Sequence, residues 1–402
     1  MIALRRPDRL GEIDFHVTSS MLATIVKVAQ KPCQALESVR ITVEDPTGPS
    51  ILAHNTFLGG SAPHLREIKL DGIAFPFPAV QQVLLSTNNL VELQLFNIPH
   101  DAYFSPNDLV TGLSSLVQLK RLTIDFRSPA SSPPPSMARS PPRRTTLPSL
   151  KFLDFHGTSG YLEEFVAQID LPACYEITIG LFNDIFFEIP QFCKFIPRLD
   201  TLTSPTRAIV THNLNFVSVQ FVKERERRSE NCVLKTSCRQ FDWQLSFVTQ
   251  ISSQLSPIFS SVHTLDIQSD DELPTGEDVD STQWLELFQP FTHVTQVYVL
   301  EKLVPGIAEA LVAEDMTPEV LPELTSLQLG GYRRFPSVAK AAEKFVTTRR
   351  LSGRIVSLTS GEEVCLHCSS HHTITLNRSR SRSGNGGRKG NGGIRNWNGR
   401  SP

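Results

Sequence analysis

The side chains best suited to hold a metal ion gather near the carboxyl end of the sequence, in Cys365-Leu-His-Cys368-Ser-Ser-His371-His372. Two cysteines separated by two residues, with histidines in reach, supply the sulfur and nitrogen ligands that zinc prefers. A zinc domain also needs a second ligand pair at a suitable distance and an apolar core around it, and the surrounding sequence contains neither. Because short motifs of this kind often arise by chance, we expect no metal site and no cofactor.

Residues 377–402 could instead bind phosphate. They contain six arginines, one lysine and no acidic residue, so the remainder of the chain carries a net charge of −9 against −2 for the whole. The stretch Arg378-Ser-Arg-Ser-Arg-Ser383 and the glycine-rich stretch that follows are similar to tails that bind RNA electrostatically. The alternative is a solvated tail with no binding role. An RNA-associated protein is therefore a second hypothesis, and we do not expect nucleic acid to be the main partner.

Motifs that carry enzymatic chemistry are missing from the sequence. There is no Gly-x-Ser-x-Gly elbow for a nucleophilic serine, no His-Glu-x-x-His for a catalytic zinc and no phosphate-binding Walker loop. Seven cysteines, an odd number, favour free thiols over a disulfide framework. We therefore expect a protein that is not an enzyme and has no catalytic residue.

A short phrase of aliphatic residues returns along most of the chain. Each copy has leucine or valine at its first position and aliphatic or aromatic residues at its fourth and sixth positions. The clear copies begin at Leu65, Leu90, Leu119, Leu150, Val262, Val294 and Leu324, and a weaker copy begins at Leu36. The copies form two groups, one from Leu36 to Leu150 and one from Val262 to Leu324, and neighbouring copies within each group begin 25 to 32 residues apart. This spacing is at or just above the upper end of the range for leucine-rich repeats, about 20–29 residues.

The segments between these phrases carry the signals of helices. Ser105 and Pro106 can provide an N-cap and a first helical proline, and Ser159 can cap the helix of the next repeat. Strand followed by helix, repeated, predicts an α/β fold: an irregular leucine-rich-repeat solenoid, or horseshoe, with parallel strands on the concave face and helices on the convex face. The positions that often carry Asn or Cys in such repeats are Ile73 and Ile98 here, so we expect no asparagine ladder.

The same pattern divides the chain into four parts. Residues 1–127 form a first solenoid arm, and residues 128–146, with six prolines, form a disordered Pro/Ser/Arg loop. Residues 147–360 form a second arm. Near 209–236, apolar and polar residues alternate with a period of two, which predicts antiparallel strands inserted in this arm. Residues 361–402 form a disordered basic tail.

The sequence gives no sign of a membrane protein. No apolar run approaches the roughly 18 residues that a spanning helix needs, and the N-terminus lacks the apolar core of a signal peptide. We expect an intracellular protein, cytoplasmic or nuclear, that has no membrane partner.

Several longer phrases, in their order along the chain, resemble those of one family. They are Phe57-Leu-Gly-Gly-Ser-Ala-Pro-His-Leu65, Leu70-Asp-Gly-Ile-Ala-Phe-Pro76, Leu95-Phe-Asn-Ile-Pro-His100, Tyr161-Leu-Glu-Glu164, Phe182-Asn-Asp-Ile185, Ser237-Cys-Arg-Gln-Phe-Asp-Trp-Gln-Leu245 and Gln283-Trp-Leu-Glu-Leu-Phe-Gln-Pro-Phe291. On these phrases, residues 4–357 resemble the basidiomycete fungal F-box-like leucine-rich-repeat proteins.

The resemblance implies a role in recognition. F-box proteins are substrate-binding subunits of SCF-type ubiquitin ligases, in which the F-box docks on the Skp1 adaptor and the repeats capture the substrate. Residues 5–13 resemble the segment that follows the F-box, and we find no copy of the F-box itself. We therefore expect Skp1 to be a partner only if an F-box lies upstream. The alternative is an F-box-less leucine-rich-repeat scaffold.

The strand phrases also predict where a protein partner would bind. The first, fourth and sixth residues point into the core, so the third, fifth and seventh point to the concave face. Charged and aromatic side chains recur at these positions, and such side chains supply much of the energy of protein interfaces. The candidate partner-binding residues are Glu67, Lys69, Glu92, Phe96, Arg121, Phe152, Asp154, Asp266 and Tyr298. The alternative is that they form only the solvated side of the sheet.

Overall fold

A computed structural model of the chain describes residues 9–28, 31–44, 57–75, 77–129, 144–182, 188–199, 201–225, 228–269, 281–313, 320–331 and 336–360. The chain divides into two compact units, Met1–Glu362 and Glu363–Pro402, and all the described residues belong to the first. The cysteine-histidine motif near residue 368, the basic tail and residues 130–143 of the proline-rich loop lie outside the described residues, so the predictions made for them stay predictions.

The first unit is built on a single sheet of fourteen strands, in the order β1-β2-β3-β4-β5-β7-β9-β12-β11-β10-β13-β14-β15-β16. The strands are β1 (Glu12–Val17), β2 (Ser38–Val43), β3 (Glu67–Asp71), β4 (Glu92–Ile98), β5 (Arg121–Phe126), β7 (Phe152–Gly157), β9 (Glu176–Leu181), β10 (Arg207–His212), β11 (Phe216–Arg225), β12 (Arg228–Ser237), β13 (Thr264–Ser269), β14 (Gln296–Val299), β15 (Ser326–Leu329) and β16 (Ser357–Ser360). Neighbouring strands are parallel except where β11 pairs with β10 and with β12.

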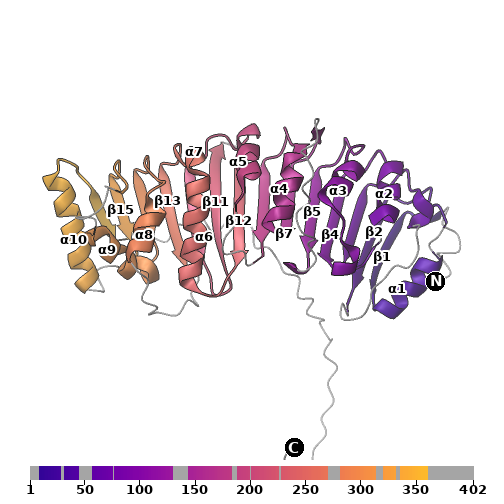
Figure 1. Ribbon diagram of the computed structural model, residues 1–402, viewed down its shortest axis with the longest axis horizontal. Coiled ribbons are helices and arrows are strands. Elements are labelled where there is room, and N and C mark those ends of the chain that lie inside the picture. The colour runs from indigo at the N-terminus through magenta and orange to yellow at the C-terminus, as the bar shows by residue number, and fades with distance from the viewer. Residues whose placement is uncertain are drawn as a thin grey trace, which may run out of the picture. The chain divides into compact units, whose positions relative to one another are not determined.

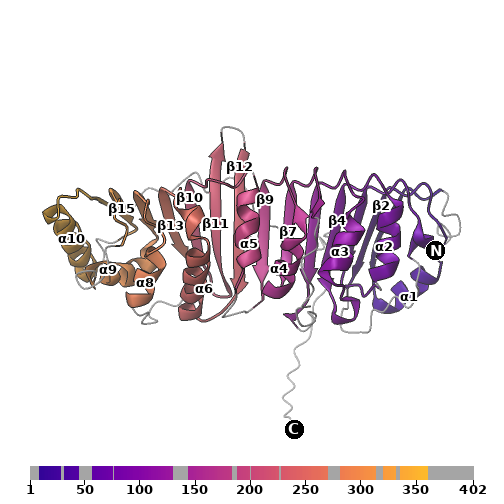
Figure 2. The same ribbon diagram turned by 45° about the horizontal axis from the view of Figure 1, so that its top comes forward.

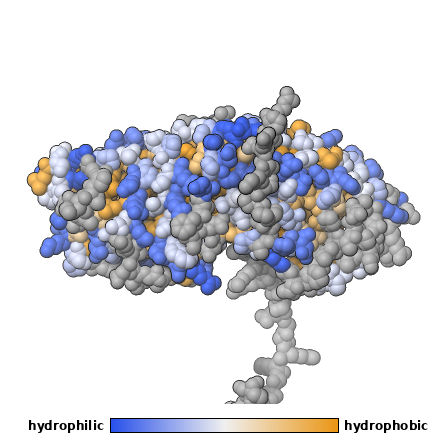
Figure 3. Space-filling view, viewed as in Figure 1, coloured by the Kyte–Doolittle hydropathy of each residue, from blue (hydrophilic) through white to orange (hydrophobic). Residues whose placement is uncertain are grey.

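Helices cover one face of this sheet, as Figures 1 and 2 show from two directions. They are α1 (Ser19–Val28), α2 (Phe77–Ser86), α3 (Pro106–Leu113), α4 (Ser159–Ala167), α5 (Pro190–Phe195), α6 (Phe241–Gln254), α7 (Ser256–Phe259), α8 (Ser281–Phe288), α9 (Val304–Ala313) and α10 (Pro336–Leu351). On the side of the helices, hydrophilic and hydrophobic residues are interspersed over the surface (Figure 3). Strand-then-helix units thus repeat along one sheet, which confirms the predicted α/β solenoid of leucine-rich-repeat type.

The burial of the returning phrase explains why each unit forms. Leu65 is fully buried where the chain enters β3, and Ile68 and Leu70 are buried within the strand, while Glu67 and Lys69 between them stay partly exposed. This alternation is the signature of a strand with one face on the core. The same pattern returns in most of the other strands, so that the buried residues form one continuous apolar core between the sheet and the helices.

The turns of the repeats are closed by apolar side chains. Ile73 and Ile98 occupy the positions where an asparagine ladder would run, and both are buried against the core. Helix capping follows the sequence in α3, where Ser105 and Asp108 form a capping box and Pro106 is the first helical residue. The predicted cap of α4 is wrong by one residue: Thr158, and not Ser159, accepts from the backbone N–H of Tyr161.

An antiparallel hairpin interrupts the parallel ladder in its middle. After β9 the chain continues to β10, three strands further along the sheet, and β11 and β12 then fill the space between them. Because β12 is parallel to β9 and β10 is parallel to β13, the ladder continues on both sides of the hairpin. β11 and β12 have ten residues each, and their paired ends project beyond the neighbouring strands (Figure 2).

The loop before β7 is shorter than the proline-rich stretch suggested. Thr145–Thr146 form a short strand, β6, which pairs with β8 (Ile169–Asp170) in a separate two-stranded sheet. The Arg144 side chain donates to the carbonyl of Ala167. The last residues of the predicted 128–146 loop therefore belong to ordered structure, a correction to its boundary.

Two charged side chains, Glu163, which is partly buried, and Arg349, which is buried, form hydrogen bonds with backbone groups of neighbouring segments. The Glu163 carboxylate of α4 accepts from the backbone N–H groups of Gln191 (2.7 Å) and Phe192 (2.8 Å) and so caps α5. Arg349 of α10 is only 4% exposed, and its guanidinium donates to the carbonyls of Val320 and Leu321. These contacts connect neighbouring repeats, because buried backbone groups need a partner.

Candidate functional site: the open face of the sheet

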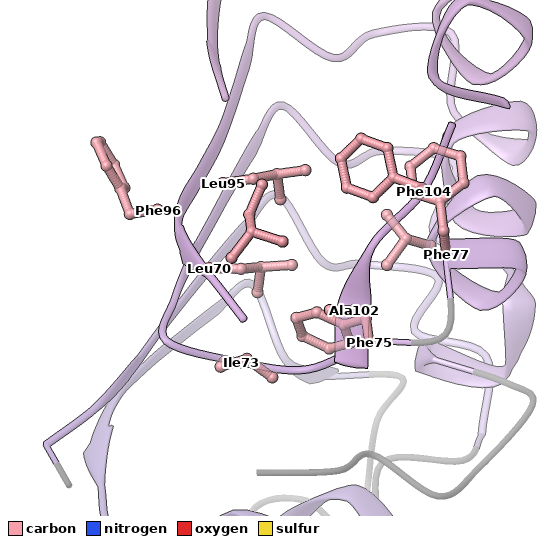
Figure 4. Close-up of a pocket in the computed structure, with 10 residues that line it drawn as sticks. Leu70, Ile73, Phe75, Phe77, Leu95, Phe96, Ala102 and Phe104 are labelled. Carbon is pink, nitrogen blue, oxygen red and sulfur yellow. The ribbon is translucent and has the colours of Figure 1, made fainter. Parts of the chain in front are cut away.

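The face of the sheet that the helices leave uncovered is called the open face here. It is formed by the third, fifth and seventh residues of the strand phrases, which point away from the core. Figure 4 shows this alternation in β4, where Phe96 points to the opposite side from its neighbour Leu95, which lies on the core side together with Leu70 of β3. Strand alternation places all nine predicted partner-binding residues on this face.

The strand register decides which of the nine lie together. Glu67, Glu92, Arg121 and Phe152 are aligned in one row across β3, β4, β5 and β7. Lys69 and Asp154 belong to the next row, and Phe96 of β4 is aligned with Asp71 of β3 in a third row. Asp266 and Tyr298 are aligned with each other on β13 and β14, on the far side of the hairpin. The structure thus gathers seven of the nine on four consecutive strands.

At the N-terminal end of the open face, one arginine lies close to three carboxylates. Arg40 of β2 donates to both oxygens of Glu67 at 2.6 Å and to Glu12 at 3.2 Å, and its guanidinium lies 3.9 Å from Asp14. The hydrogen bonds from Arg40 lower the pKa of Glu67, against the opposing effect of its partial burial. Arg40 stands at the fifth position of the weak phrase that begins at Leu36, so its position on this face was available from the sequence.

Two aromatic rings of the open face lie beneath cationic side chains. The Lys69 ammonium lies 5.4 Å from the centre of the Phe96 ring, and the Arg121 guanidinium carbon lies 4.2 Å from the centre of the Phe152 ring. Phe152 also packs edge-on against Tyr175, with ring centres 5.0 Å apart. Such cation–π pairs hold the charged groups flat against the sheet.

A cluster of titratable groups occupies the middle of the open face, on β5, β7 and β12. His156 Nδ1 lies 2.7 Å from Asp125 Oδ1. Gly180, between the strands of His156 and Lys235, leaves room for both: a Cβ there would come within 2.6 Å of His156 and 3.1 Å of Lys235. Desolvation by the neighbouring side chains raises the pKa of Asp154, an effect that Lys235 opposes and Asp125 reinforces.

Asp266 requires a correction. Alternation puts it on the open face, yet the residue is only 2% exposed, because the guanidinium of Arg207 on β10 binds its carboxylate, with Nε at 2.7 Å. Asp266 therefore acts as the buried partner of an ion pair, and Arg207 is the member of that pair nearer to solvent. Arg207 and Lys235 belong to the hairpin region, where no copy of the phrase marks the strands, so the repeat pattern could not identify them.

One apolar void among the described residues is too small to compete with the open face as a site. The apolar void in Figure 4, between β3, β4 and α2, measures about 20 Å³ and is lined by side chains such as Phe75, Phe77 and Phe104. That is the room of a single water molecule, and an apolar void of this size stays dry. Within the described part of the chain, no three His, Cys, Asp or Glu side chains are placed to hold a metal ion.

A wider hollow of about 560 Å³ lies at the start of α6. It is lined by Asn215, Ser237, Cys238, Arg239, Gln240 and Trp243. Trp243 is 38% exposed there, whereas Trp284 is 1% exposed. Trp243 therefore lies on the outer side of the first turn of α6, whereas Trp284 is part of the core.

No helix among the described residues is both long enough and apolar enough to cross a membrane. No protein-family model matches the sequence, and no curated protein matches it. Among solved structures, the chain is similar to the leucine-rich repeat-containing protein LegL7 from Legionella pneumophila, with 12% identical residues over 86% of this chain and 99% of that chain. The TM-score of 0.32 is too low for this likeness to carry an argument.

Proposed function

We propose that this chain is a non-enzymatic recognition module that binds a protein partner across the open face of its sheet. The observation that carries the proposal is the continuous ladder of fourteen strands whose uncovered face displays charged and aromatic side chains in aligned rows. Helices bury the other face, so the open face is the broad surface of fixed geometry that remains. A surface of this kind suits a macromolecular partner, because small ligands need an enclosed pocket.

A finer proposal concerns the cellular context of that partner. On the resemblance in sequence described above, the captured protein is the substrate of an F-box-type ubiquitin ligase. Skp1 would then join only through an F-box segment upstream. An F-box-less scaffold would use the same open face, and the two possibilities differ in whether Skp1 is recovered together with the full-length protein.

Site-directed photocrosslinking tests the main proposal. A photoreactive amino acid is placed at Gln94 or Gln296 on the open face, and at Thr111 of α3 or Glu286 of α8 as matched positions on the helical side; Gln296, Thr111 and Glu286 are exposed, and Gln94 is partly exposed. We expect the open-face positions to form crosslinks to one or a few discrete proteins in cell extract, and the helical positions to form none of the same products.

The proposal places the partner on the open face, so it is decided by which of the photoreactive positions form crosslinks. Equal labelling of the same protein from Thr111 and Glu286 would contradict a partner seated on the open face. The same crosslinked products, if they appear with a chain unfolded before irradiation, would mark non-specific adhesion and would also count against the proposal.

A further inference from the structure

Charge is distributed unevenly over the open face. The seven consecutive strands β1, β2, β3, β4, β5, β7 and β9 display an excess of carboxylates, and this part of the face is called the acidic half. Its open-face acids are Glu12, Asp14, Glu67, Asp71, Glu92, Asp125, Asp154 and Glu176, and its open-face bases are Arg40, Lys69 and Arg121. Eight acids against three bases leave an excess of five negative charges when the histidines are neutral.

The other side of the hairpin is different. Among the side chains that the structure describes on β10, β11 and β13 to β16, the charged ones that alternation places on the open face are Arg207 and Asp266, which bind each other. The remaining positions carry mostly Ser, Thr and Gln, with Tyr298 among them. Lys235 on β12 marks the boundary. The excess charge is thus confined to one half of the ladder.

The acidic half does not neutralise itself. Arg40 is shared among three carboxylates, and Lys69 and Arg121 lie over aromatic rings. Among the described residues, no cationic side chain forms an ion pair with Glu92, Asp154 or Glu176. Desolvation is the main cause of the raised pKa of Asp154; Lys235 and Arg121 oppose it, and repulsion from the nearby Asp125 adds to it. Positive charge supplied from outside would relieve this repulsion.

The aromatic side chains of the same half add a second reason. Phe96 and Phe152 are partly exposed, and each already holds a cationic group of this chain against its ring. Carboxylates beside aromatic rings are the surroundings in which lysine and arginine side chains bind well, through charge-assisted hydrogen bonds and cation–π contacts together. Nucleic acid, with its phosphates, would be repelled by this surface.

We propose that the acidic half of the open face binds a lysine- and arginine-rich segment of the partner protein. The proposal rests on the proposed function, because it names the chemistry of the partner that the open face receives. The register supports a segment that runs across the strands: Glu67 and Glu92 lie side by side in one row and Asp154 in the next. Adjacent strands are about 4.8 Å apart, so a segment crossing them passes the next side chain of a row at each strand.

The test measures binding of two fluorescein-labelled peptides to the full chain by fluorescence polarisation. One peptide alternates arginine with serine, and the other has glutamate in place of each arginine. The variant Glu92→Lys/Asp154→Lys changes the acidic half, and Glu286→Lys/Glu309→Lys makes the same change of charge on the outer sides of α8 and α9, where both glutamates are exposed. Circular dichroism confirms that each variant is folded, and Glu92→Gln/Asp154→Asn serves as a milder substitute if the lysine variant is not.

We expect the arginine peptide to bind and the glutamate peptide not to bind. The open-face variant should lose about tenfold or more in affinity, the helix variant less than about twofold, and added salt should weaken binding in the wild type, since contacts between charged surfaces are screened. Equal losses in the two lysine variants, or no preference for the arginine peptide, would overturn the proposal.

The result is separate from the test of the proposed function. If the photocrosslinked partner attaches through the open face but by an acidic or neutral segment, the recognition module stands and the charge inference fails. If no partner is crosslinked from the open face while the arginine peptide still discriminates between the two lysine variants, the acidic half attracts basic peptides and the proposed function fails.

Discussion

Lowering the pH should weaken the packing of β10 against α6, because His212 must take up a proton in an apolar site. His212 is fully buried, and its Nδ1 lies 3.1 Å from Gln244 Oε1 on α6. The side-chain amide of Gln244 donates to the carbonyls of Asn213 and Cys238, which fixes its oxygen as the acceptor for His212. Nδ1 therefore carries the proton, and the ring is neutral.

The magnitude follows from the surroundings of the ring. The rings of Phe241 and Trp284 lie 4.8 and 6.1 Å from the centre of the imidazole. Burial among such groups lowers the pKa of His212 from 6.5 to about 4, against a smaller opposing effect of the bond to Gln244. At 1.36 kcal/mol per pKa unit, this shift corresponds to about 3 kcal/mol.

The sign of the effect is set by which state binds the proton. Above about pH 6.5, His212 is neutral in both the folded and the unfolded chain, so it contributes nothing to the pH dependence of the free energy of unfolding. Between pH 6.5 and 4, the unfolded chain takes up a proton that the folded chain refuses. The free energy of unfolding should therefore fall by about 3 kcal/mol over this range on account of His212 alone.

The assay compares the wild type with His212→Asn, whose side-chain amide can still donate to Gln244 and does not titrate. Denaturant unfolding between about pH 7 and pH 4 gives the pH dependence of stability, and amide hydrogen exchange locates the change in β10, β11 and α6. His64→Asn, at an exposed position, is the matched control and should follow the wild type.

Parallel pH curves for the wild type and His212→Asn would refute this reasoning. If His212→Asn does not fold, titration of the His212 ring in the wild type by nuclear magnetic resonance decides the question. A midpoint near the ordinary value of 6.5 would then show that burial does not hold the imidazole neutral.

Three further predictions concern the contacts that join the repeats. Arg349→Met should cost about 1–3 kcal/mol, since it removes the buried guanidinium that donates to the carbonyls of Val320 and Leu321. Hydrogen exchange should locate the loss in α10 and the neighbouring repeat, and exchange unchanged there would contradict this role. Glu163→Ala should cost about 1 kcal/mol in thermal unfolding through loss of the cap of α5, and an unchanged melting temperature would exclude the cap. Gly306→Ala should destabilise α9, because the added Cβ would lie 2.9 Å from Trp284 Nε1. Gly160→Ala in α4, where no atom lies within 4 Å of the added carbon, should stabilise by up to about 1 kcal/mol. If both variants changed the free energy of unfolding in the same direction, the contact with the indole would be unimportant.

The strand phrase made most of the architecture predictable. Its buried positions recur at the spacing of one strand and one helix, and the structure has a strand at each clear copy from Leu65 to Leu324. The N-cap at Ser105 and the first helical residue at Pro106 were equally predictable, because the residue types at these two positions are specific; the reciprocal bond to Asp108 was not predicted. The cap of α4 was not, since Thr158 and Ser159 stand side by side and either hydroxyl could bond the first turn.

The strand phrase could not predict which other side chains each residue of the open face contacts. In sequence, Asp266 is like any other residue at the fifth position of the strand phrase. Only the pairing of β10 with β13 shows that the guanidinium of Arg207 covers its carboxylate. Trp243 and Trp284 have similar apolar neighbours in sequence, yet they face opposite sides of their helices with respect to the core. Such differences depend on which strands become neighbours, and the hairpin of β11 and β12 changes that order without leaving a repeat signal.

Hydroxyl-radical footprinting of the full chain, with and without its crosslinked partner, tests the central claim most directly. Phe96, Phe152 and Tyr298 report on the open face, and Met21, Leu85 and Trp243, which are 57%, 50% and 38% exposed, report on surfaces away from it. If the partner occupies the open face, oxidation of the first three falls while that of the others stays the same. Protection of Met21, Leu85 or Trp243 with no change at Phe96, Phe152 and Tyr298 would contradict the account.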